Sequence, residues 1–225
     1  MKKLMLAICL LSTSSLGWAQ SAPSLGSAQS FAVLGASTVT NAGPTVITGD
    51  LGVSPGTAVT GFPPGRVTGG TIHAGDATAT AAQAAAHTAY ANLVAQPCGT
   101  NLTGKTLGTS PGAVTLSPGV YCFNSSAQLT GTLTLDGSGL YVFKMGTTLT
   151  TASKSSVVLA KGATAGNVFW QVGSSATLGT NTVFVGSILA NISDTVTTGA
   201  SVTGRVFALT GAVTLSENRI RAASK

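Results

Sequence analysis

A glycine-led apolar block recurs five times in the second half of the chain, as GVYCF (119–123), GLYVF (139–143), GNVFW (166–170), GSILA (186–190) and GRVFA (204–208). The central apolar pairs of these blocks begin at residues 122, 142, 168, 188 and 206, so the steps between them are 20, 26, 20 and 18 residues. A period of this length is typical of a solenoid, in which each repeat stacks on its neighbours.

Each apolar block is followed by a threonine-rich block and usually by a short third block, such as TLTL (132–135), SVVL (156–159) or TVFV (182–185). Three short strands in a turn of about 20 residues predict a mainly β fold, a parallel β-solenoid of triangular cross-section. The uneven steps indicate irregular coils and disfavour strict hexapeptide or nonapeptide solenoids. The alternative is an antiparallel sandwich with a turn every 8–12 residues or so, but such sequences do not usually realign their apolar blocks in tandem.

One segment departs from this pattern and predicts a single long helix. Residues 73–96 read HAGDATATAAQAAAHTAYANLVAQ, dominated by alanine and without glycine after Gly75. Asp76 suits an N-cap and Pro97 ends the run, which places the helix at about 76–96. Its many alanines permit close packing against a sheet.

The first residues have the features of a secretory signal peptide. Lys2 and Lys3 precede an apolar run from Leu4 to Leu11, and cleavage is expected after Ala19. Residues 20–225 then form a single domain, and no later segment reaches the roughly 18 apolar residues of a membrane span. We therefore expect a secreted protein, either extracellular or retained in a periplasm.

Charge and cysteine content limit the remaining classes of function. Without Lys2 and Lys3, nine Lys and Arg face five Asp and Glu, a net charge of +4 (9 − 5) that is scattered along the chain. Nucleic-acid binding needs clustered basic residues, so we expect no nucleic-acid partner. Cys98 and Cys122 remain after cleavage, and an even pair in an exported protein favours a disulfide, with two buried free thiols as the alternative.

The second strands of successive turns align into a column of threonines. GTTLTTAS (146–153) matches GSSATLGT (173–180) without a gap, and the alternate apolar residues of each are expected to point inward. The intervening positions then point outward and line up from turn to turn. The predicted column is Thr130, Thr150, Thr177, Thr197 and Thr214.

The same alternation predicts further outward residues on this face: Thr148, Ser175 and Thr195, with Thr38, Thr40 and Thr60 from the N-terminal section. Neighbouring columns are expected to hold only Thr, Ser, Ala, Gly or Asp194, and no Lys, Arg or Glu. A flat grid of methyl and hydroxyl groups without long charged side chains can order water into an ice-like layer, since Thr is stiff at χ1. The alternative explanation is that Thr simply favours exposed strand positions.

A resemblance to a known family supports the first explanation. The stretch LGSAQSFAVLGASTVTNAGPTVITGDLGVSPGTAVTGFPPG (25–65) resembles the opening of the large microbial ice-binding family, and GTLTLDG (131–137), TTASKSSVVL (150–159), NVFWQVGSSATLG (167–179) and GAVTL (211–215) resemble its later stretches. The resemblance implies an irregular right-handed β-solenoid with one long α-helix alongside. It also implies a monomeric antifreeze protein that binds the surface of an ice crystal through the flat face, giving thermal hysteresis and inhibiting ice recrystallisation.

Enzymatic activity is not expected, because the residues that it needs do not come together. No two of Asp50, Asp76, Asp136, Asp194 and Glu217 share an outward column, so paired carboxylates are missing. His73 and His87 fall at or inside the helix without metal-binding partners at suitable spacing. We therefore predict no catalytic residue, no metal and no cofactor.

The stronger rival is an adhesin or a carbohydrate-binding module, and a self-assembling surface protein is a further alternative. Sugar binding usually uses exposed aromatic rings. Tyr121 and Trp170 lie in the apolar first strands, where a role in the core or under the helix is expected instead.

Overall fold

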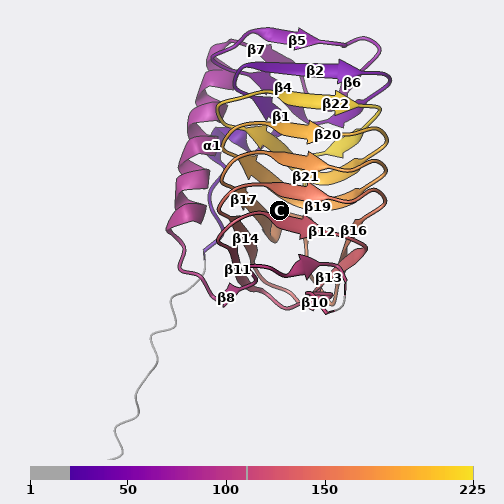
Figure 1. Cartoon of the computed structure of the whole chain (residues 1–225). Coiled ribbons are helices and arrows are strands. Elements are labelled where there is room, and N and C mark those ends of the chain that lie inside the picture. Colours follow the sequence, from indigo (N-terminus) through magenta and orange to yellow (C-terminus); the bar gives the residue numbers. More distant parts are fainter. Residues whose placement is uncertain (1–20, 110, 225) are drawn as a thin grey trace, which may run out of the picture.

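The computed structural model describes residues 21–109 and 111–224, so the predicted signal peptide lies outside the described residues. The chain winds into a three-sided parallel β-solenoid with one helix along its side (Figure 1), as the sequence predicted. Every pair of adjacent strands is parallel. Each coil contributes one strand to each of three faces, which we name the helix face, the threonine face and the third face.

The helix face contains the repeated apolar blocks. Its strands, in spatial order, are β8 (Thr100–Asn101), β11 (Gly119–Phe123), β14 (Tyr141–Met145), β17 (Val168–Val172), the second half of β19 (Val183–Ala190), the second half of β21 (Ser201–Ala208), β1 (Phe31–Gly35), β4 (Asp50–Val53) and β7 (Ile72–Ala74). Consecutive residues are apolar here because the face is buried on both sides. Phe143 points into the solenoid, whereas its neighbour Val142 packs under the helix.

The other two faces carry the second and third strands of each coil. The threonine face runs β9 (Thr106–Leu107), β12 (Ala127–Leu129), β15 (Leu149–Thr151), β18 (Ala176–Leu178), β20 (Asp194–Val196), β22 (Val213–Ser216), β2 (Thr38–Ala42) and β5 (Ala58–Thr60). The third face runs β10 (Thr115–Leu116), β13 (Thr132–Asp136), β16 (Ser156–Ala160), the first halves of β19 and β21, β23 (Arg219–Arg221), β3 (Val46–Thr48) and β6 (Arg66–Thr68).

The coils do not stack in sequence order. The C-terminal coil of β21, β22 and β23 pairs with the first coil of β1, β2 and β3, which in turn pairs with β4, β5 and β6. In Figure 1 the yellow C-terminal strands accordingly lie between the indigo N-terminal strands and the orange ones. Helix α1 (Ala77–Ala95) carries the chain from β7 at one end of the solenoid to β8 at the other.

Helix α1 is held by its cap and by close packing. The Asp76 carboxylate accepts a hydrogen bond from Ala79 N at 2.8 Å, and Gln96 ends the helix. Ala82, Ala86 and Ala89 are fully buried against the helix face, where a larger side chain would force the helix away from the sheet. Among the described residues, no helix is long and apolar enough to cross a membrane.

Aromatic rings stack along the interior, which confirms the core role predicted for two of them. Tyr121 is 7% exposed and Trp170 is fully buried. The Phe143 ring lies between them, with centroids 5.4 Å from Tyr121 and 4.0 Å from Trp170. The Trp170 indole donates its N–H to Val185 O at 2.9 Å, so its only polar group is satisfied.

Candidate functional site

The central column of the threonine face consists of residues that are paired from strand to strand without a shift of register. Thr177 pairs with Thr150 on one side and with Thr195 on the other, and Thr195 pairs with Thr214. In order from β9 to β5, the column is Thr106, Gln128, Thr150, Thr177, Thr195, Thr214, Thr40 and Thr60. Seven of its eight members are therefore threonine, and all are exposed or half-buried.

The predicted column was wrong in two of its members. Gln128, not Thr130, pairs with Thr150, and Thr195, not Thr197, pairs with Thr177. Thr130 and Thr197 lie two residues further along their strands, on the same face but in the neighbouring column. The reason is that alternation fixes which side a residue faces, whereas the alignment across coils is fixed by the backbone ladder.

The prediction for Asp194 was also wrong. It shares parity with Val196 and points into the solenoid, where it is 2% exposed and lies in register between Ala176 and Val213. Both carboxylate oxygens lack a hydrogen-bond partner, and burial raises the pKa of this carboxyl well above its ordinary value. Burial thus favours the neutral form of this carboxyl, and its inward position keeps it off the threonine face.

Smaller side chains flank the central column on both sides. Thr38, Thr148 and Ser175 lie two residues before it, in a column that also holds Ala58, Gly104, Ser126, Ser193 and Ala212. Ala152, Gly179 and Ser216 lie two residues after it, with Thr130 and Thr197. Some hydroxyls in these flanks bond to the backbone: Ser175 Oγ accepts from Ser193 N, and Thr197 Oγ1 donates to Leu178 O at 2.6 Å.

The inward residues of these strands fill the core beneath the face, and Val39, Leu129, Leu149 and Val213 are fully buried. The backbone hydrogen bonds between the parallel strands set the usual spacing of about 4.8 Å. Same-side residues along a strand lie about 6.7 Å apart, so the threonines form a two-dimensional grid. Within the described ranges, none of the outward positions of these three columns carries Lys, Arg, Asp or Glu.

Sequence reasoning missed Thr106 and Gln128 as members of the central column. Each precedes an inward leucine, Leu107 or Leu129, and that alternation is the signal that identifies them. The segment around Thr106 lacks the apolar first block of the later coils, which hid its place in the repeat. The N-terminal threonines Thr38, Thr40 and Thr60 do extend the face, at the end that continues from β22.

Two acidic residues, Asp76 and Asp136, form their contacts away from this face. Asp136 pairs with Lys161 at 2.8 Å. Asp76 caps α1 and lies 2.7 Å from His73 Nδ1, and the bond from Ala79 N, followed by that from His73, lowers the pKa of the Asp76 carboxyl. Across residues 21–109 and 111–224, no group of three or more His, Cys, Asp or Glu side chains is arranged to hold a metal ion.

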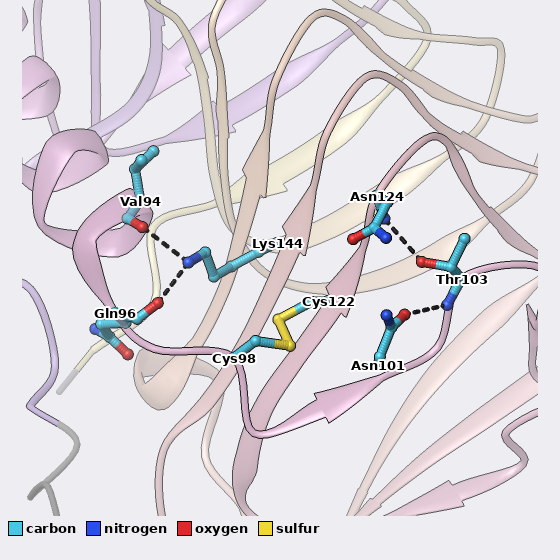
Figure 2. Close-up of a disulfide and its surroundings, with 8 residues drawn as sticks. All are labelled: Val94, Gln96, Cys98, Asn101, Thr103, Cys122, Asn124 and Lys144. Atoms are coloured by element: carbon cyan, nitrogen blue, oxygen red, sulfur yellow. Dashed lines mark hydrogen bonds between the residues drawn. A yellow bond between two sulfur atoms is a disulfide. The ribbon is translucent and has the colours of Figure 1, made fainter.

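The cysteines form a disulfide at the end of the helix, as the even pair favoured. Cys98 and Cys122 are joined with their Cα atoms 5.9 Å apart, and this bond ties the segment after α1 to β11 (Figure 2). Beside it, the Lys144 ammonium donates to Val94 O and Gln96 O at the C-terminal end of α1. A cation at that end of a helix satisfies free carbonyls and opposes the helix dipole.

The protein is a three-sided parallel β-solenoid that presents a charge-free grid of threonines. Comparison with known sequences identifies the family to which it belongs. Residues 33–221 match the family model described as Ice-binding-like. The chain belongs to this family, whose members are ice-binding proteins and not enzymes. Proteins of the family are typically extracellular.

Individual relatives agree with this assignment. The chain is 54% identical over 201 residues to an ice-binding protein of Nostoc sp. (strain HG1), covering 87% of this chain and 72% of that protein. A crystal structure of an ice-binding protein from the Antarctic ascomycete Antarctomyces psychrotrophicus superposes with a TM-score of 0.84 at 40% identity, covering 91% of this chain and all of that one. Another, from an Antarctic biological consortium, gives a TM-score of 0.86 at 41% identity over 97% of both chains. The adhesin alternative finds no support in these matches.

Proposed function

We propose that this protein adsorbs to ice through the threonine face, and that the residues in contact with ice are the central threonine column and its small neighbours. The observation that carries the proposal is the unshifted column of seven threonines across eight strands. The proposed contact set therefore keeps Thr38, Thr40, Thr60, Thr130, Thr148, Thr150, Ser175, Thr177, Thr195, Thr197 and Thr214, and adds Thr106.

The chemistry of the face suits a solid made of water. Each threonine presents a methyl group, which water can only surround, beside a hydroxyl, which water can hydrogen-bond. Because Thr is stiff at χ1 and its backbone is fixed in a parallel ladder, both groups hold their positions at little entropic cost. A regular array of this kind orders the adjacent water into an ice-like layer that can merge with a crystal.

Adsorption of this kind has defined consequences for ice growth. A protein fixed on the crystal blocks growth beneath it, so ice advances only as curved fronts between bound molecules. Curvature lowers the local freezing point and produces thermal hysteresis, and the same pinning slows recrystallisation. The protein acts as a monomer in this scheme and, with its N-terminal signal removed, acts outside the cell.

A substitution on the face tests the proposal against a matched change elsewhere. Thr195→Tyr places a ring in the middle of the central column, whereas Thr203→Tyr places the same ring at an exposed position of the third face. Both positions accept the ring outside the core, so both variants should keep the melting temperature of the wild type. Thr195→Tyr should lose most of the thermal hysteresis and most of the adsorption to an ice surface, and Thr203→Tyr should keep both.

Two results contradict the proposal. A wild-type protein that leaves ice growth unchanged and does not adsorb to ice would overturn the function. Full activity in Thr195→Tyr together with loss of activity in Thr203→Tyr would assign ice binding to the third face instead.

A further inference from the structure

The three exposed arginines of the described chain gather at one end of the third face. Arg66 lies on β6, and Arg219 and Arg221 lie on β23, all three pointing outward. Arg66 and Arg219 both pair with Val46 of β3, so they stand in one column about two strand spacings, or roughly 9.6 Å, apart. Arg219 and Arg221 face the same side of one strand, about 6.7 Å apart. The fold thus assembles a basic cluster from residues that are scattered in the sequence.

None of the three guanidinium groups is paired with a carboxylate within the described residues. The carboxylates that contact a basic side chain there are Asp76, beside the His73 ring, and Asp136, beside Lys161. Glu217 follows β22 and Asp50 is the first residue of β4, and neither pairs with a basic side chain of the described residues. The arginine cluster therefore presents free donors to solvent.

Protection of a sheet edge does not explain the cluster. Charged residues on an edge strand prevent pairing with another chain, and this accounts for Arg66 on β6. β23, however, is an interior strand between β21 and β3. Arg219 and Arg221 thus need a different explanation, and they border a groove of about 400 Å³ whose other walls include Val46, Thr48, Ser201 and Thr203.

We propose that this cluster binds an acidic polysaccharide, through carboxylate or sulfate groups spaced along an extended sugar chain. A guanidinium group binds such anions in bidentate fashion, and hydroxyls of Thr48, Ser201 and Thr203 line the same groove for contact with sugar oxygens. The described third face has no outward aromatic residue, which disfavours single-stranded nucleic acid because base stacking needs such rings. The exposed apolar residues on its strands are the valines Val158 and Val183, and none of these strands presents an outward Trp, Phe or Leu of the kind that inserts into a membrane beside a basic patch.

The position of the cluster makes this binding compatible with adsorption to ice. The third face and the threonine face are different sides of the solenoid, and β23 follows β22 around a corner of the same coil. A molecule held on an extracellular acidic matrix by its arginines leaves the threonine grid uncovered. The matrix would then carry an array of ice-binding surfaces.

Binding to a polyuronate tests the proposal. Calorimetry on the secreted protein, well above freezing, should show that alginate binds, that neutral dextran does not, and that added salt weakens the binding. Replacing Arg66, Arg219 and Arg221 together with Gln should weaken alginate binding by roughly tenfold or more, since three charge-assisted contacts are lost. The single variant Arg221→Glu should also weaken alginate binding. Melting temperatures check that each variant is folded.

The matched control removes the same charge elsewhere, by replacing the exposed Lys105, Lys154 and Lys161 with Gln. This variant should bind alginate within about twofold of the wild type if the cluster, and not net charge, is responsible. An equal loss in both triple variants would overturn the proposal. So would a wild-type protein that does not bind alginate, or one that prefers duplex DNA or anionic lipid vesicles to it. Because no ice is present, failure here is separate from failure of the ice-binding proposal.

Discussion

Asp194 lies directly beneath the threonine face, and replacing it with Asn tests how a buried carboxyl affects stability. Its side chain is 2% exposed, lies between Ala176 and Val213 in the inward column, and has no hydrogen-bond partner. Burial raises the pKa of the carboxyl well above the value of 3.8 that applies to the unfolded chain. The folded protein therefore holds a proton that the unfolded chain releases at much lower pH.

The sign and size of the effect follow from proton linkage. Between the unfolded and folded pKa values the unfolded chain binds fewer protons, so the free energy of unfolding decreases as pH rises. One proton corresponds to a slope of about 1.4 kcal/mol per pH unit within this window. The stabilising effect of the lowered pKa of Asp76 is lost only as pH falls below about 3.8, so it lies outside this range.

Urea unfolding followed by circular dichroism from pH 5 upward measures the slope. The wild type should lose stability relative to Asp194→Asn as pH rises, because the amide does not ionise. Glu217→Gln, at an exposed turn, is the matched control and should follow the wild type. Parallel stability curves for the wild type and Asp194→Asn would refute the reasoning, because they would mean that the folded protein does not hold the extra proton.

Three further changes have defined outcomes. Gln128→Thr completes the central column between Thr106 and Thr150, so thermal hysteresis should rise while the melting temperature stays the same; a fall in hysteresis would count against the column as the ice contact. Replacing Cys98 and Cys122 with Ser should lower the free energy of unfolding by about 3 kcal/mol, since the bond closes a loop with a sequence separation of 24. Ice adsorption of the folded fraction should be unchanged in that variant, as an ice pull-down would show. Lys144→Met removes the donor to Val94 O and Gln96 O and should cost about 1 kcal/mol in chemical denaturation, whereas no loss would mean that the helix end needs no cation.

The sequence predicted the fold because each side of the solenoid leaves a different pattern. The helix face is covered on both sides, so Val142 and Phe143 can both be apolar and the block stands out at each turn. The threonine face is covered on one side and alternates. Residues 77–95 are rich in alanine and contain no glycine or proline, which favours the helix that covers the first of these faces.

Other features depended on interactions that alternation does not encode. Whether Gln128 or Thr130 pairs with Thr150 is decided by the ladder between coils that differ in length, and both residues point outward. The inward position of Asp194 contradicts the general rule that carboxylates stay exposed. The arginine cluster depends on β23 pairing with β3, a contact between opposite ends of the chain.

That contact between the chain ends also determines how large the threonine face is. The strands β2 and β5 join the face only because β22 pairs with β2. We call this junction between the C-terminal coil and the first coil the seam, and without it the grid would lose Thr40 and Thr60. Buried polar groups hold the seam together: Arg205 donates to Gln29 O at 2.6 Å and to Ala223 O at 2.9 Å, and Asn218 N donates to Thr45 Oγ1 at 2.9 Å.

The Arg205 guanidinium stays charged in this position, since burial lowers its pKa only to about 10. This buried cation bonds to carbonyls from both ends of the chain. Pairing the two ends in another register would be costly, because the guanidinium and the carbonyls would lose their hydrogen-bond partners. The buried hydrogen bonds of Arg205 therefore help to fix the register in which β1 and β2 pair with the C-terminal coil. A continuous grid across eight strands follows from that internal constraint as much as from the threonines themselves, and an ice-binding surface built from both chain ends depends on it.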